Sequence, residues 1–441
     1  MTRRYLDQYR EFSTGAAKTA PAWVNDRRRA AAARFEALGF PTTRNEDWHF
    51  TTVGPIAERE FTFVAARTGD ARRDDFDAYG FGGSTDESIV FVNGRFAPEL
   101  STLDRIDPRV RVLSLAEAWT GAPELAKRVG TIVSDEQAAF TALNTAFMPD
   151  GVVIHVPKDV QVAAPIQVLF VTDAHAAKAV MYPRNLIVLD RHAKATVIES
   201  YVAIGDAAYF TNAVTEVSIA DGATLEHYKI QREGRRAFHV GTTETVQARD
   251  SHYVSFSFAT GASLSRTNIY TKLDGEGCGA TLNGLYMLDG EQHCDHQTRI
   301  EHVAPNCFSR ELYKGVLDGR SHGVFNGKVY VHSAAQKTDG KQTNNTLLLS
   351  KDAQIDTKPQ LEIFADDVKC THGATVGRLD ETAWFYMKSR GMNAEAARRL
   401  LIYAFAADVI ENIEQAAVRE ALERVTLERF VKVEELIPVS S

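Results

Sequence analysis

The feature that most constrains the fold is a long strand-like tract, from Gly151 to about residue 376, with almost no helical period. Its strands tend to begin near an Ala-Thr or similar pair that follows a turn. Four such starts lie at Thr196, Thr224, Tyr253 and Thr281, so the steps between them are 28, 29 and 28 residues. Later strands follow at about half that spacing. The tract is therefore a repeat.

A coil of roughly 28–30 residues with two short strands cannot bury its inner face alone, but stacking on the next coil buries it. The repeat therefore predicts a parallel β-helix. A pair of antiparallel sandwiches is the alternative, and the regular step and the shortage of tight hairpin signals favour the solenoid. We expect three regions: a helical and mixed region over 1–150, the β-helix over 151–377, and a helical domain over 378–441.

Both flanking regions carry helix signals. Trp23–Leu38 is rich in helix formers and is ended by Gly39, and Ser134 predicts the N-cap of a helix over 134–144. Ser88–Gly94 predicts a strand that runs into an Asn-Gly turn. The segment Pro41–Thr51 mixes aromatic and charged residues and is interpreted as a packing corner. Near the end, Asn393 is a plausible N-cap for an amphipathic helix, and a second helix follows over 416–431.

Bulk properties exclude several classes of function. The net charge is −8 with mixed signs and no basic patch, which argues against a nucleic-acid partner. The most apolar run, Leu400–Ala407, is too short to span a bilayer, and the amino terminus lacks the apolar core of a signal peptide. No phosphate-binding loop occurs, so we expect this chain to bind no nucleotide. The four cysteines are scattered, which predicts reduced thiols and a cytoplasmic protein.

Cys370 and His372 are the best candidate metal ligands. They lie two positions apart in the last predicted strand, so both side chains would project from one face. A thiolate and an imidazole suit iron or an iron–sulfur cluster. Two groups are fewer than the four ligands of a structural metal site, so the missing ligands would come from elsewhere, for example from another chain. The alternative is a buried cysteine beside a loop histidine.

A second candidate lies in His293-Cys294-Asp295-His296. Strand alternation places Cys294 and His296 on one face, which makes a possible half-site for zinc or iron. The competing interpretation is a strand with one buried cysteine.

Five segments resemble the SufB/SufD family of iron–sulfur cluster assembly proteins, in the same order and over essentially the whole chain. They are Pro41–Trp48, Phe140–Gly151, Asp366–Asp380, Phe385–Gly391 and Ala394–Ala407. The block that begins at Asp366 is the most specific. Within the family, SufB-type chains carry a cluster-accepting cysteine where this chain has Asn344, whereas His372 is kept, which is the pattern of SufD-type members.

The resemblance implies a right-handed parallel β-helix with helical regions at both ends. It implies a non-catalytic scaffold that pairs with SufB and binds the ATPase SufC through its C-terminal helices, where Leu401, Tyr403 and Phe405 lie. His372, with a lesser contribution from Cys370, would help to hold transient iron or a nascent cluster at the SufB interface. A homodimer is possible in isolation.

Three other interpretations remain open. A SufB-like scaffold would hold a cluster alone and would need a second cysteine near His372. A β-helix carbohydrate-active enzyme would need paired carboxylates in a flank groove, and no convincing pair is found. A purely structural partner of the ATPase would leave His372 without a role.

Overall fold

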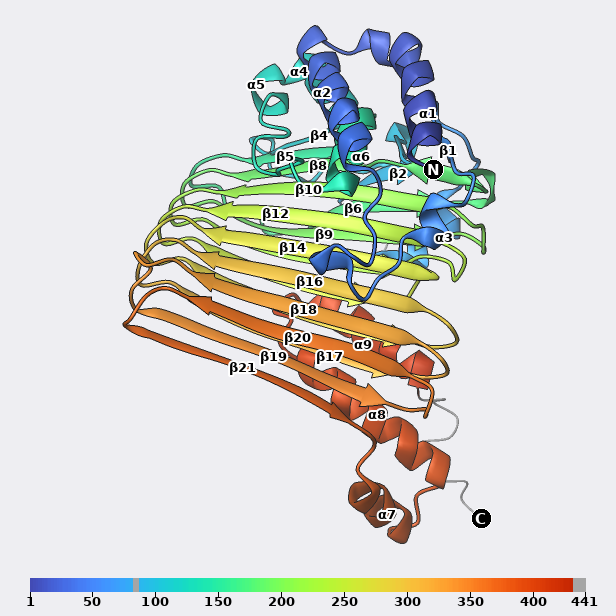
Figure 1. The fold of residues 1–441 in the computed structure, drawn as a ribbon, viewed down its shortest axis with the longest axis vertical. Helices are drawn as coiled ribbons and strands as arrows, with labels where there is room; N and C mark the ends of the chain where they lie inside the picture. Colours follow the sequence, from blue (N-terminus) through green and yellow to red (C-terminus); the bar gives the residue numbers. More distant parts are fainter. Residues whose placement is uncertain (82–86, 431–441) are drawn as a thin grey trace.

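A computed structural model describes residues 1–81 and 87–430. Two long, mainly parallel sheets face each other, and successive strands of the chain alternate between them (Figure 1). Sheet A has the order β20-β18-β16-β14-β12-β10-β8-β5-β4, with β7 and β1 at its side, and sheet B has the order β21-β19-β17-β15-β13-β11-β9-β6-β2-β3. This arrangement confirms the β-solenoid and excludes the antiparallel sandwiches.

The strands of sheet A are β4 (Arg111–Ser114), β5 (Val152–Val156), β8 (Arg184–Leu189), β10 (Phe210–Ile219), β12 (Phe238–Gln247), β14 (Leu264–Leu273), β16 (His293–His302), β18 (His322–Val331) and β20 (Gln354–Ile363), with β1 (Thr62–Phe63) and β7 (Ala179–Met181). Those of sheet B are β2 (Ser88–Val92), β3 (Arg95–Phe96), β6 (Ile166–Thr172), β9 (Lys194–Ala203), β11 (Thr224–Arg232), β13 (His252–Ala259), β15 (Gly279–Leu288), β17 (Phe308–Leu317), β19 (Thr338–Leu348) and β21 (Val368–Gly377). The helices are α1 (Thr2–Thr14), α2 (Ala22–Leu38), α3 (Gly54–Ala57), α4 (Leu115–Gly121), α5 (Pro123–Ala126), α6 (Ala139–Phe147), α7 (Glu381–Ser389), α8 (Ala394–Ile410) and α9 (Ala416–Phe430).

One corner of each coil has the same local structure. Before each strand of sheet B from β9 to β19, a residue with positive φ is followed by a small buried residue. The positive-φ residues are His192, Gly222, Asp250, Gly277, Asn306 and Lys337, and the buried ones are Ala193, Ala223, Ser251, Cys278, Cys307 and Thr338. The left-handed residue turns the chain, and the small one lets the next coil stack closely. The coil length predicted from sequence is thereby explained, and Cys278 and Cys307 belong to this structural column.

The space between the sheets is filled by inward-facing side chains of successive coils. The inner face is apolar near β2, β5 and β6, and includes tyrosines further along, such as Tyr286 and Tyr313. Glycine allows these rings to fit. Gly284 pairs with Tyr313, and a Cβ at Gly284 would lie 2.3 Å from the Tyr313 ring.

Helices cover the first coils, as Figure 1 shows at the blue end of the chain. Helix α2 begins at Ala22 and ends at Leu38, which confirms that prediction, and Gly39 follows with φ 64°. The β2–β3 hairpin confirms the predicted Asn-Gly turn, with φ of 50° at Asn93 and 77° at Gly94. The ring of Phe147, on α6, stacks on Tyr182 at 4.6 Å between centroids.

The predicted N-cap at Ser134 is wrong, because α6 begins at Ala139. The preceding segment is held instead by the buried carboxylate of Glu216. Its oxygens accept hydrogen bonds from the backbone N–H groups of Gly130 (2.5 Å), Ile132 (3.0 Å) and Val133 (3.2 Å). These contacts come from a distant strand, so the local capping signal is overridden.

The segment that includes Pro41 and Thr51 is a packing corner, as predicted, and the structure places it on the outer face of sheet A. The guanidinium of Arg266 lies 3.8 Å from the Trp48 ring centroid and donates to the Asp47 carbonyl at 2.6 Å. Thr51 donates to Asp295 at 2.6 Å. This corner therefore fixes the N-terminal region to the flank of the solenoid.

Helices α8 and α9 dock on the outer face of sheet B. Ile402, Ala406 and Val409 belong to one buried cluster with residues of β11, β13 and β15. Asn393 caps α8 as predicted, because its side chain accepts from the N–H groups of Glu395 and Ala396. No helix in residues 1–81 and 87–430 is long and apolar enough to cross a membrane.

Candidate functional site

The last coil of the solenoid has two open edges. Strands β20 and β21, each ten residues long, pair on one side only, with β18 and β19, and no other strand of the described chain covers their outer edges. They lie at the end of the solenoid opposite the N-terminal helices (Figure 1). A free strand edge presents unpaired backbone N–H and C=O groups, which can pair with a strand of another chain.

Cys370 and His372 lie on one face of β21. In the register, Cys370 neighbours Gly340 and His372 neighbours Gln342, and these two residues of β19 are buried. A Cβ at Gly340 would lie 3.3 Å from the Cys370 Sγ. Both candidate ligands therefore belong to the column that faces the space between the sheets, at its open end.

The two side chains differ in accessibility. Cys370 is half-buried beside Val329, Val331 and Ala335, and this burial raises the pKa of its thiol, which keeps it protonated at neutral pH. His372 is exposed. His372 is thus the more available ligand, and the pair is incomplete as a metal site on its own.

A buried polar column continues beneath His372. The Gln342 amide donates to the Glu311 carboxylate at 2.6 Å, and both residues are buried. Burial raises the Glu311 pKa to about 7. Asn344, two positions along β19, is also buried and donates to the Tyr313 carbonyl at 3.3 Å. Asn344, where the resemblance implies a cysteine in SufB-type chains, therefore lies just below the open end.

Cys294 and His296 do come together, but inside the solenoid. Their Sγ and Nδ1 atoms lie 3.6 Å apart, and both side chains are fully buried. Burial raises the Cys294 pKa to about 12 and lowers that of His296 to about 4, so both are neutral at pH 7. His296 also packs between the rings of Tyr286 and Tyr313, at 5.1 and 5.3 Å.

The three predicted partner-binding residues lie on α8 and are all half-buried. Phe405 faces the solenoid: the Lys314 Nζ lies 4.5 Å from its ring centroid and donates to its carbonyl at 3.0 Å. Leu401 and Tyr403 lie outside the core of the cluster between α8 and sheet B.

Sequence reasoning missed two exposed apolar groups. Phe385 and Tyr386, on α7, are 68% and 57% exposed, and α7 extends beyond the last coil (Figure 1). At the open end, Phe364 and Val376 are 59% and 49% exposed. The adjacent aromatic residues Phe385 and Tyr386 were a usable signal of exposure, because neighbouring side chains of a helix point in different directions and cannot both face one surface.

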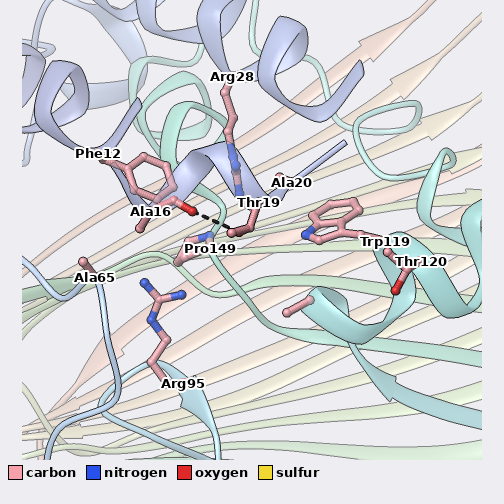
Figure 2. A pocket seen from close by; sticks show the side chains of 11 residues that line it. Phe12, Ala16, Thr19, Ala20, Arg28, Ala65, Arg95, Trp119, Thr120 and Pro149 are labelled. Atoms are coloured by element: carbon pink, nitrogen blue, oxygen red, sulfur yellow. Dashed lines mark hydrogen bonds between the residues drawn. The ribbon is translucent and has the colours of Figure 1, made fainter. Parts of the chain in front are cut away.

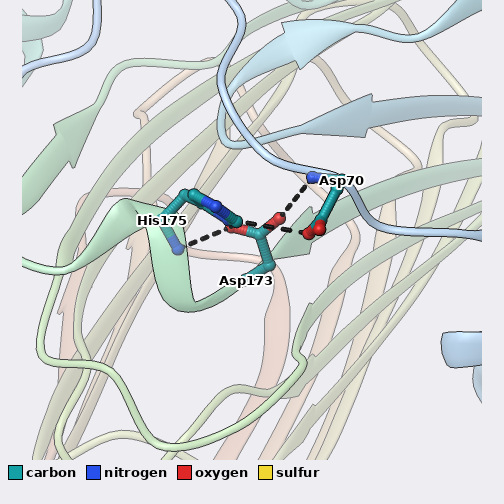
Figure 3. Close-up of side chains that lie close together, drawn as sticks. All are labelled: Asp70, Asp173 and His175. Carbon is teal, nitrogen blue, oxygen red and sulfur yellow. Dashed lines mark hydrogen bonds and ion pairs between the residues drawn. The ribbon is translucent and has the colours of Figure 1, made fainter.

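Another group of potential ligands lies near the first coils. Asp70, Asp173 and His175 each place a ligand atom within 4.8 Å of the others (Figure 3). Asp173 has a structural role, since it accepts from the Asn93 amide at 2.8 Å and from the backbone N–H of His175 at 2.9 Å. Its two companions are exposed. Sequence spacing gave no sign of this group.

Comparison with known proteins gives matches along nearly the whole chain. A family described as SUF system FeS cluster assembly, SufBD core domain, matches residues 170–405, and the SufBD protein N-terminal region matches residues 1–168. An iron–sulfur cluster assembly SufBD family protein of Synechocystis sp. is 34% identical over 412 residues, which cover 90% of this chain and 89% of that protein.

Two proteins called iron–sulfur cluster assembly protein SufD are also similar. That of Escherichia coli is 34% identical over 386 residues, 87% of each chain, and that of Bacillus subtilis is 26% identical over 449 residues, 98% and 99% of the two chains. Together with the two family regions and the β-solenoid with helices at both ends, these similarities show that the chain belongs to the SufB/SufD family of iron–sulfur cluster assembly scaffolds.

Proposed function

We propose that this chain is a non-catalytic, cytoplasmic SufD-type scaffold that pairs with a SufB-type protein through the open end of its solenoid. The observation that carries the proposal is the pair of ten-residue edges of β20 and β21, with which no further described strand pairs, and the exposed apolar residues beside them. A partner strand would satisfy the free backbone groups and cover Phe364 and Val376.

At this interface, His372 supplies one nitrogen ligand to iron or to the nascent cluster, which is the cargo of the assembly. Its exposure on the inward column of β21 supports this role, and the missing ligands come from the partner. Cys370 contributes less, because its thiol is half-buried and protonated. It is also the one cysteine of the four that lies on the last coil, so the second cysteine needed for a SufB-like scaffold is absent there.

The test is anaerobic co-purification of the chain with SufB and SufC from the same source, followed by iron and sulfide analysis. We expect His372→Ala to leave the complex intact but to lower its iron content at least about tenfold, because one ligand of a few is removed. His49→Ala is the matched control, since His49 is exposed on the N-terminal corner. Unchanged iron in the His372 variant would refute the ligand role.

We also propose that the ATPase SufC docks on α8 beside Leu401 and Tyr403. Leu401→Asp and Tyr403→Asp should each weaken ATPase co-purification about tenfold, because a charge would be buried at the contact. Ala416→Asp, which adds the same charge at an exposed site on α9, serves as the control. Phe405 is a poorer test position, because its packing on Lys314 also holds α8 to the solenoid. Normal ATPase binding by both variants would exclude this docking face.

A further inference from the structure

A cavity of about 510 Å³ lies among the N-terminal elements (Figure 2). These elements stand at the end of the solenoid opposite β21 (Figure 1). The cavity lies between the segment that links α1 to α2 and helix α4. Two arginines, Arg28 and Arg95, approach it from opposite sides, and Trp119 forms a flat apolar wall (Figure 2). No residue that lines the cavity in the described part of the chain is acidic. We call it the two-arginine pocket.

Arg28, on α2, is buried, and no carboxylate among the described residues forms an ion pair with it. It is 3% exposed, and its guanidinium donates to the Asn25 side chain and to the Met148 carbonyl, both at 3.1 Å. Its Nε has no hydrogen-bond partner in residues 1–81 and 87–430. Burial lowers the Arg28 pKa to about 10, so the group is still charged at neutral pH. Within the part of the chain that the structure describes, none of its hydrogen-bond partners therefore carries a negative charge.

Arg95, on β3, is in a similar position. Its Nε and one terminal nitrogen donate to the Val64 carbonyl at 3.2 and 2.7 Å, and its guanidinium lies 5.5 Å from the Phe63 ring centroid. Asp150 is the nearby acid, but its carboxylate accepts from the backbone N–H groups of Phe96 and Gly151 at 3.0 and 2.9 Å. Asp150 attracts Arg95 without forming an ion pair with it.

Two poorly neutralised cations beside one cavity are unfavourable when the cavity holds only water. Each is partly desolvated, and each repels the other. An anion between them would remove both costs, and guanidinium groups bind carboxylates and phosphates with strong, charge-assisted hydrogen bonds. The Trp119 wall would accommodate a flat or apolar part of an organic ligand.

We propose that the two-arginine pocket binds a small anion of the phosphate or carboxylate type between Arg28 and Arg95. The site is separate from the open end of the solenoid, and it does not depend on the role proposed for His372. Binding there would tie together α2, β3 and α4.

The experiment measures thermal unfolding of the full chain during titration with inorganic phosphate and, separately, with citrate. An anion that binds the folded state and not the unfolded state stabilises it by RT ln(1 + [L]/Kd), so the melting temperature keeps rising as the anion concentration rises above Kd. We expect Arg28→Gln and Arg95→Gln each to weaken the apparent affinity at least about tenfold, since each removes a charge-assisted contact. Arg29→Gln is the matched control, because Arg29 lies next in the same helix, is exposed and pairs with Asp26.

A rise in melting temperature with phosphate alone or with citrate alone identifies the type of anion. Either result supports the site when the Arg28 and Arg95 variants lose the rise and Arg29→Gln keeps it. Without ligand, Arg28→Gln should unfold at the wild-type temperature or above it, because it removes a buried charge that lacks an acidic partner. The proposal is overturned if wild type responds to neither anion, or if either arginine variant responds as the control does.

Discussion

The two ends of the solenoid are built in opposite ways. At the N-terminal end, the parallel sheets stop at short antiparallel strands, β3 and β4, of two and four residues, and helices pack over the first coils. At the other end, β20 and β21 remain ten residues long and parallel, and no strand in residues 1–81 and 87–430 pairs with their outer edges. At the N-terminal end the sheets terminate in edge strands of two and four residues, which limit edge-to-edge pairing, whereas the open end keeps long edges. This difference supports the proposal that the open end pairs with another chain.

The largest expected effect comes from placing a charge on the open end. Val376→Lys should abolish co-purification with SufB, because Val376 is half-exposed on the uncovered strand and a lysine there would be desolvated in the interface. The same variant should prevent any homodimer of the isolated chain, as measured by light scattering. Thr371→Lys is the control on the same strand, because Thr371 lies on its other face. If Val376→Lys assembles normally, the two ends do not differ in function.

The buried interior of the solenoid and its outer face should differ in how their carboxyl groups make stability depend on pH. Burial raises the Glu311 pKa to about 7, above its value in the unfolded chain, so the folded state binds this proton more tightly. This contribution to the free energy of unfolding is fully present below about pH 4.5 and is lost as the pH rises through 7. The total decrease is about 3 kcal/mol. Urea unfolding from pH 5 to pH 8 should show this decline in wild type and a flatter profile in Glu311→Gln.

Glu362→Gln is the control for that experiment, because Glu362 lies on the outer face of β20 beside Lys328, at 2.9 Å. Equal pH profiles for wild type and Glu311→Gln would mean that Glu311 is not held as a buried neutral acid.

A smaller effect is expected from added volume. A Cβ at Gly284 would contact the Tyr313 ring at 2.3 Å, whereas a Cβ at Gly373, on β21, would meet nothing within 4 Å. Gly284→Ala should therefore lower the free energy of unfolding by about 2 kcal/mol, and Gly373→Ala should change it by less than about 0.5 kcal/mol. Urea denaturation of the two variants checks the difference. Similar losses in both would show that the open end is packed as tightly as the interior.

The sequence alone predicted correctly those structural features whose signal lies within a few residues. Strand alternation placed Cys294 with His296, and Cys370 with His372, because side chains two apart share a face in any strand. The coil length followed from the regular spacing of strand starts near Ala-Thr or similar pairs, and the structure adds that a left-handed residue precedes a small buried one at this corner. The predicted strand starts at Thr196 and Tyr253 lie within two residues of those of β9 and β13.

Other features needed the folded chain. Ser134 has the chemistry of an N-cap, but the carboxylate of Glu216 holds the neighbouring backbone, and no local pattern reveals a contact over more than 80 residues. Cys294 is buried and His372 is exposed only because Cys294 lies in a middle coil and His372 lies on the last one.

The sequence by itself determined the repeat, the faces of the strands and the family, since backbone chirality and side-chain alternation act over a few residues. Only the tertiary structure decided which polar groups are accessible and which are left without a counter-charge. Arg28 and Arg29 are neighbours in one helix, yet Arg28 lines a cavity and has no acidic partner in the described part of the chain, whereas Arg29 is exposed beside Asp26. The reason is physical: burial and charge pairing depend on what packs against a residue, and those contacts come from distant parts of the chain.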